Sequence, residues 1–170
     1  MAKQEPWFIH ERAEWFASLV LTKHNDVKVQ PYSGTDTALD LLVEVLKDGR
    51  PTLRFFGVQL VPYMDLPNLP NADGWALSQR GKEPLDAALP LCVFVIGVRK
   101  PEGIYRWVAG PVVEDGRAVL RPDVAANWQP LDEAGAARLI GQVNAWYDAL
   151  NGDPTPNLLR AADKAARREK

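Results

Sequence analysis

The chain has little that could form a disulfide or a metal cluster. Its 170 residues include one cysteine, Cys92, and two histidines, His10 and His24. One cysteine cannot form a disulfide within the chain, and the two histidines have no cysteine or acidic ligand pattern beside them, so we expect no zinc site. Cys92 lies inside the apolar run LPLCVFVIG, and we interpret it as a core residue rather than a nucleophile.

Other absences limit the classes of function. No apolar run approaches the roughly 20 residues that span a bilayer, and the opening MAKQEPWFIHERAE has no apolar signal core. We therefore expect a cytoplasmic protein without membrane contact. The net charge of -2 provides no general attraction for nucleic acid, so such binding would need a local basic patch. The sequence also lacks a phosphate-binding glycine loop and a Gly-x-Ser-x-Gly elbow.

The first part of the chain favours a helix and then strands. Arg12–Asn25 repeats apolar residues at helical spacing, and Asp26–Tyr32 alternates as a short strand before the turn-forming SGTDT. The runs Leu39–Lys47 and Thr52–Pro62 predict an antiparallel hairpin around Asp48-Gly49, a dipeptide of tight turns. Because Arg50-Pro51 follows the glycine, we expect a slightly longer loop there.

The middle of the chain alternates between turn signals and apolar runs. We expect an irregular crossing loop, a short strand and a short helix at Tyr63–Asp73, Gly74–Ser78 and Pro84–Leu89. Two further hairpins are predicted, with strands at Leu91–Arg99 and Ile104–Ala109, then at Val112–Val113 and Ala118–Leu120 around Asp115-Gly116. The first of these strands is too continuously apolar to face water, so we place it in the centre of the sheet.

The last helix has the clearest boundaries. Asp132 is a suitable N-cap, apolar residues recur at helical spacing from Leu139 to Leu150, and Gly152 with Pro154 stops the helix. The elements together predict an α/β (α+β) fold with one mixed β-sheet flanked by helices. We expect one domain over residues 1–152 and a polar, basic tail over 153–170, which is more typical of a solubilising helix than of a nucleic-acid contact.

Three polar residues within apolar elements are candidates for a site. Strand alternation places Asp40 on the face opposite Leu39 and Leu41, and the hairpin can bring Asp40 beside Gln59. Glu14, on the first helix, could complete an oxygen-rich group. One or two carboxylates with waters and substrate phosphates are the ligands that magnesium takes, so this spacing is compatible with a magnesium site.

The succession RAEWF, LDLLVEV, GVQLV, LPLCVFVIGV, IYRWVAG and QVNAWYDAL resembles the bacterial domain of unknown function 4365 family. That family is a branch of the restriction-endonuclease-like PD-(D/E)XK superfamily, and the resemblance covers roughly Glu11 to Leu150. It implies a restriction-endonuclease-like core and a magnesium-dependent phosphodiesterase site. Glu14, Asp40 and Gln59 match the helix acid, the strand acid and the third motif position.

The match fails at the lysine of the third motif, where this chain has Val61. A lysine in such sites offsets developing negative charge, which an isopropyl group cannot do. Lys47 could supply a replacement ammonium, although it adjoins the hairpin turn, far along the strand from Asp40. We therefore expect magnesium binding and cleavage to be weak or lost.

Three functions remain open. The first is a nuclease-fold domain with a degenerate site that binds nucleic acid or a protein partner, in a bacterial defence system as the resemblance implies. The second is an active magnesium-dependent phosphodiesterase. The third is a purely structural or regulatory interaction protein, in which aromatic residues such as Trp75, Trp107 or Trp128 form an interface. Each candidate polar residue also has an ordinary structural interpretation, since buried polar groups are commonly hydrogen-bonded.

Overall fold

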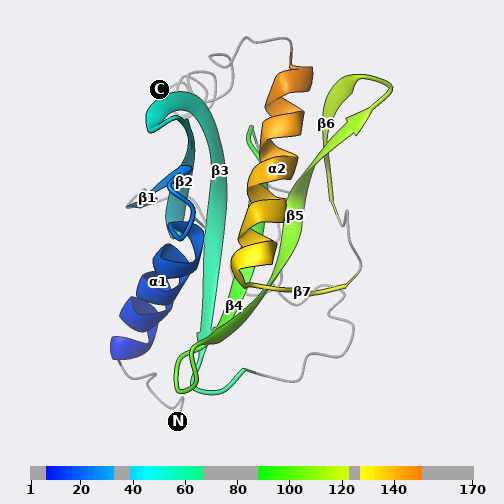
Figure 1. Cartoon of the computed structure of the whole chain (residues 1–170). Coiled ribbons are helices and arrows are strands. Elements are labelled where there is room, and N and C mark those ends of the chain that lie inside the picture. The colour runs from blue at the N-terminus through cyan, green and yellow to red at the C-terminus, as the bar shows by residue number, and fades with distance from the viewer. Residues whose placement is uncertain (1–6, 33–38, 67–87, 123–126, 151–170) are drawn as a thin grey trace, which may run out of the picture.

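The chain folds into one mixed β-sheet with both helices on the same face (Figure 1). The computed structural model describes residues 7–32, 39–66, 88–122 and 127–150. In chain order its elements are α1 (Phe8–Leu21), β1 (Val27–Pro31), β2 (Leu41–Lys47), β3 (Arg50–Tyr63), β4 (Leu91–Gly97), β5 (Glu102–Glu114), β6 (Arg117–Arg121), β7 (Gln129–Pro130) and α2 (Glu133–Ala149).

The strands lie in the order β1-β2-β3-β4-β5-β6, and β7 pairs with β5. Only β3 and β4 are parallel among these pairs of described strands. The predicted fold class, α+β with one mixed sheet, is therefore confirmed. All seven residues of β4 are buried, which confirms its predicted central place.

The core fills the space between the sheet and the two helices. Alternate residues of the strands face the helices, among them Phe56, Val58 and Leu60 of β3. Cys92 is fully buried in the same cluster, and this burial raises the pKa of its thiol. A buried neutral thiol is a poor nucleophile, which agrees with the prediction of a core residue.

The hairpin between β2 and β3 is tighter than predicted. Lys47 pairs directly with Arg50, and Asp48 and Gly49 form a two-residue turn with φ of 51° and 72°. The predicted longer loop is wrong because the irregularity lies inside the ladder instead, as a register shift at Val45/Leu46. The bulge lets Pro51 lie in β3 without lengthening the turn.

Several element boundaries differ from the sequence prediction, most of all those of α1 and β5. Helix α1 begins at Phe8 and ends at Leu21, four residues earlier at each end than predicted. The predicted strands at 104–109 and 112–113 are one strand, β5, which pairs with β4 as far as Ala109 and with β6 from Gly110 onward. Gly110-Pro111 therefore marks a change of neighbour rather than the end of a strand.

The N-cap of α2 is confirmed, since the Asp132 carboxylate accepts a hydrogen bond of 2.7 Å from the Gly135 N–H.

Trp107 is buried, which corrects its assignment to an exposed interface, and Trp128 is half-buried. Trp75, the strand predicted at 74–78, most of the helix predicted at 84–89, the stop at Gly152 and the tail over 153–170 lie outside the described residues. No described helix is long and apolar enough to cross a membrane.

Candidate functional site

Asp40 lies just before β2 begins and is hydrogen-bonded both to the residue that follows β1 and to β3. Its N–H donates to the Val58 carbonyl and its own carbonyl accepts from the Tyr32 N–H, both at 2.9 Å. Its Oδ2 accepts a hydrogen bond of 2.6 Å from the N–H of Leu60. Strand β3 extends past the point where β2 begins, so the Leu60 N–H has no β2 carbonyl opposite it. The Asp40 carboxylate accepts this hydrogen bond in place of a strand carbonyl.

A bend at Asp40 reverses the predicted alternation of faces. A Cβ added at Gly57 would collide with the Leu39 side chain, so Leu39 lies on the face away from the helices. Asp40 turns the other way, toward α1. The prediction that Leu39 and Leu41 share one face fails because residues 39 and 40 precede the regular strand.

His10 joins the two predicted acids. Its Nε2 lies 3.5 Å from Glu14 Oε1, one helical turn away, and 3.5 Å from Asp40 Oδ1. The Asp40 side chain is 11% exposed, whereas those of His10 and Glu14 are 40% and 36% exposed. We call His10, Glu14 and Asp40 the acid cluster. Sequence reasoning missed His10 because the helix was expected to begin only at Arg12.

Gln59 is close to Asp40 along the backbone but faces the other way. Leu41 pairs with Val58, so Asp40 and Gln59 come next to each other across the hairpin, as predicted. Because Phe56, Val58 and Leu60 face the helices, strand alternation directs Gln59 and Val61 to the opposite face. Gln59 is 5% exposed there and pairs with Val93 of β4. The structure thus groups Glu14 and Asp40 with His10, and Gln59 points away from that group.

The acid cluster fits a magnesium ion poorly. Magnesium prefers a regular shell of oxygen ligands, and here the two carboxylates approach an imidazole nitrogen while the Gln59 amide faces away. One oxygen of Asp40 is also engaged by the Leu60 N–H. Within the described ranges there is no group of three or more His, Cys, Asp and Glu residues that could hold a metal ion.

The remaining candidates from the sequence, His24 and Lys47, lie away from the acid cluster. His24 Nε2 lies 3.9 Å from Glu133 Oε1, between the end of α1 and the start of α2. Lys47 lies at the opposite end of β2 from Asp40, so it does not replace the missing motif lysine. Another acid, Glu44, is buried, with an exposed fraction of 6%, and is paired in register with Lys28 and Phe55. Glu44 lies within the apolar run LLVEVL, and that position was the signal for its burial.

Comparisons with protein-family models, with curated proteins and with solved structures gave no match for this chain.

Proposed function

We propose that this chain is a nuclease-like domain whose phosphodiesterase site has degenerated, and that it acts as a binding module for nucleic acid or for a protein partner in bacterial defence. The proposal begins from the sequence resemblance, in which Glu14, Asp40 and Gln59 match motif positions and Val61 replaces the lysine. The contacts of these residues support a degenerate site over a working one.

The observation that carries the proposal is the use of the Asp40 carboxylate. One oxygen bonds to the backbone of Leu60 and the other approaches His10. A carboxylate engaged in closing a sheet has little freedom to change partners during a reaction. When protonated, the imidazole places a positive charge where the two acids would otherwise repel each other.

The third motif supports the same conclusion. Gln59 is neutral, Val61 is apolar, and both face away from α1. A phosphodiesterase needs positive charge or a metal where the transition state gains negative charge. Neither side chain supplies it, so binding without cleavage is the function that these residues support best.

A protein partner is favoured by one surface feature. Trp7, Trp15 and Leu19 are large apolar residues with exposed fractions of 79%, 65% and 45%. Trp15 and Leu19 are four residues apart on α1 and therefore share a helix face. Exposed tryptophans are enriched in protein interfaces.

The experiment follows cleavage and binding of labelled single- and double-stranded DNA and RNA, with magnesium, manganese or a chelator. Wild type is compared with Glu14→Gln, which removes a half-exposed charge, and with Glu11→Gln as a matched control on the same helix. We expect no cleavage by wild type. Val61→Lys tests whether an ammonium alone restores activity, with its melting temperature measured because the lysine enters a sheet.

Metal-dependent cleavage that Glu14→Gln abolishes and Glu11→Gln retains would overturn the proposal in favour of an active phosphodiesterase. Binding of an oligonucleotide without cleavage would identify nucleic acid as the partner. If no nucleic acid binds and Trp15→Ala abolishes a stable protein complex, the partner is a protein.

A further inference from the structure

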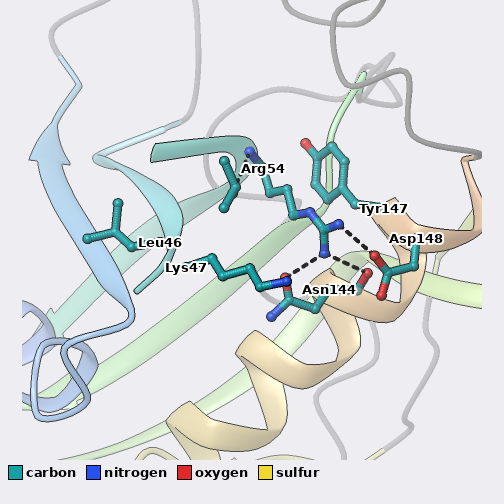
Figure 2. A pocket seen from close by; sticks show the side chains of 7 residues that line it. Leu46, Lys47, Arg54, Asn144, Tyr147 and Asp148 are labelled. Atoms are coloured by element: carbon teal, nitrogen blue, oxygen red, sulfur yellow. Dashed lines mark hydrogen bonds and ion pairs between the residues drawn. The ribbon is translucent and has the colours of Figure 1, made fainter. Parts of the chain in front are cut away.

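A cavity of about 510 Å³ lies at the end of β2 remote from the acid cluster, between the β2–β3 hairpin and the last turns of α2 (Figure 2). We call it the hairpin cavity. Its lining residues are Leu46, Lys47, Thr52, Arg54, Asn144, Tyr147 and Asp148. This volume falls in the usual range for small-molecule sites, roughly 300–1,000 Å³.

Arg54 forms one wall of the cavity and is held in a fixed orientation. Its Nη1 donates to Asn144 Oδ1 at 2.9 Å, and its Nη2 lies 2.6 Å from Asp148 Oδ1 (Figure 2). Nη1 also approaches the Asn144 carbonyl at 3.4 Å, near the negative end of the α2 dipole. The guanidinium is thus oriented before any ligand arrives, which lowers the ordering cost of binding.

Two hydroxyl groups that line the cavity are already hydrogen-bonded to the backbone. The Tyr147 hydroxyl donates to the Phe55 carbonyl at 3.0 Å and accepts from the Phe55 N–H at 3.1 Å. The Thr52 hydroxyl donates to the Val45 carbonyl. The Tyr147 bonds fix α2 against the hairpin and the Thr52 bond lies within the hairpin, so the wall of the cavity is built independently of a ligand.

The groups left to meet a ligand are donors. Lys47 is exposed and forms no ion pair with any residue in the described part of the chain. Asn144 uses its side-chain oxygen for Arg54, so its amide NH₂ remains as a donor. Lys47 and Arg54 carry two positive charges against the one negative charge of Asp148, and the lining therefore has a net positive charge.

We propose that the hairpin cavity binds the phosphate group of a nucleotide-sized ligand, with Lys47 and the Asn144 amide as donors and Arg54 as a fixed positive charge. A lysine ammonium is a mobile point charge suited to phosphate. A dianionic phosphate gains more from this lining than a neutral ligand does, and Leu46 offers apolar surface to the rest of the ligand. The inference is independent of the function proposed for the acid cluster.

The test measures binding of AMP and of adenosine to the full chain by isothermal titration calorimetry. The two probes differ only in the phosphate, and we expect AMP to bind at least about tenfold more tightly. Lys47→Ala should weaken AMP binding about five- to tenfold. Lys28→Ala, which removes an exposed lysine of β1, is the matched control and should leave the affinity unchanged.

Asp148→Asn provides a variant with the opposite expectation. It removes the negative charge of the lining and keeps a hydrogen-bonding group for Arg54, so AMP should bind about two- to fivefold more tightly. Circular dichroism of each variant checks that the fold is retained. A short single-stranded oligonucleotide, titrated in parallel, distinguishes a free nucleotide from a nucleic-acid strand as the source of the phosphate.

Weaker AMP binding in Lys47→Ala together with tighter binding in Asp148→Asn would support the proposal. Oligonucleotide binding with the same dependence on Lys47 would support it with a strand as the source. Equal binding of AMP and adenosine, an unchanged affinity in folded Lys47→Ala, or no binding of either AMP or the oligonucleotide at millimolar concentration would overturn it.

Discussion

The two ends of β2 use charged residues in opposite ways. At its start, the Asp40 carboxylate accepts a hydrogen bond from the backbone of β3 and contacts His10. At its end, about 20 Å away by strand geometry, Lys47 has no ion-pair partner in the described part of the chain, while Arg54 beside it is fixed by α2. The Asp40 carboxylate is hydrogen-bonded within the fold and is therefore poorly placed to take part in a reaction. The Lys47 ammonium lines a cavity and is available to a ligand.

The largest effect that would test this comparison is expected from Asp40→Ala. It removes a charge-assisted hydrogen bond and leaves the Leu60 N–H without that acceptor, so we expect the free energy of unfolding to fall by about 2–3 kcal/mol. Denaturant unfolding measures it, with Asp65→Ala as control, because the Arg99–Asp65 pair is exposed and should contribute at most about 0.5 kcal/mol. Equal, small losses in both variants would show that Asp40 does not stabilise the sheet.

At the other end of β2, Arg54 and Lys47 should differ. Arg54→Ala breaks the contacts with Asn144 and Asp148, and we expect a loss of about 1–2 kcal/mol in the free energy of unfolding. Lys47→Ala should stay within about 0.5 kcal/mol of wild type. If Lys47→Ala proved as destabilising as Arg54→Ala, the Lys47 ammonium would stabilise the fold. The proposed difference between Lys47 and Arg54 would then be wrong.

A pH dependence should come from the contact between Tyr147 and the hairpin. Burial raises the pKa of Tyr147, while its bond to Phe55 and the charge of Arg54 lower it in part. Its folded pKa exceeds the unfolded value of about 10, so its contribution is complete below pH 10 and is lost as the pH rises through the folded pKa.

We expect wild type to lose up to about 1.4 kcal/mol at pH 11 through this group, relative to its stability at pH 9. Tyr147→Phe lacks the titrating hydroxyl, so comparing the two proteins over this pH range isolates the effect. Parallel pH profiles for both would contradict the assignment.

The smallest effect is expected from His10→Ala. Its two contacts are 3.5 Å long and its side chain is 40% exposed, so the free energy of unfolding should change by about 0.5 kcal/mol or less. His24→Ala is a matched substitution at the other end of α1. A loss well above 1 kcal/mol in His10→Ala alone would mean that the imidazole, and not the Leu60 N–H, is the main partner of Asp40.

Much of the fold could be predicted because its signals are local. The two Asp-Gly turns, the apolar run of β4 and the Asp132 cap each depend on neighbouring residues. The continuity of β5 through Gly110-Pro111 could not be predicted, because it depends on β6 replacing β4 as the neighbour. The tight turn at Asp48-Gly49 was misjudged because a bulge two to three residues before the turn, between Val45 and Leu46, accommodates Pro51.

The candidate site was predicted only in part for a similar reason. Glu14 and Asp40 do lie near each other, but the bend at Asp40 and the earlier start of α1 bring His10 between them. The side on which Gln59 lies relative to α1 depends on where the helices pack, and strand alternation alone does not fix it. The hairpin cavity joins residues about 90 positions apart and had no local signal.

The most direct test of the central claim, that Asp40 closes the fold and that the acid cluster does not hold a catalytic metal, is the melting temperature of wild type and Glu14→Gln with chelator, magnesium or manganese. A metal that binds the folded state raises the melting temperature by linkage. The account predicts no metal-dependent shift in either protein. A rise of several degrees in wild type that Glu14→Gln abolishes would contradict it.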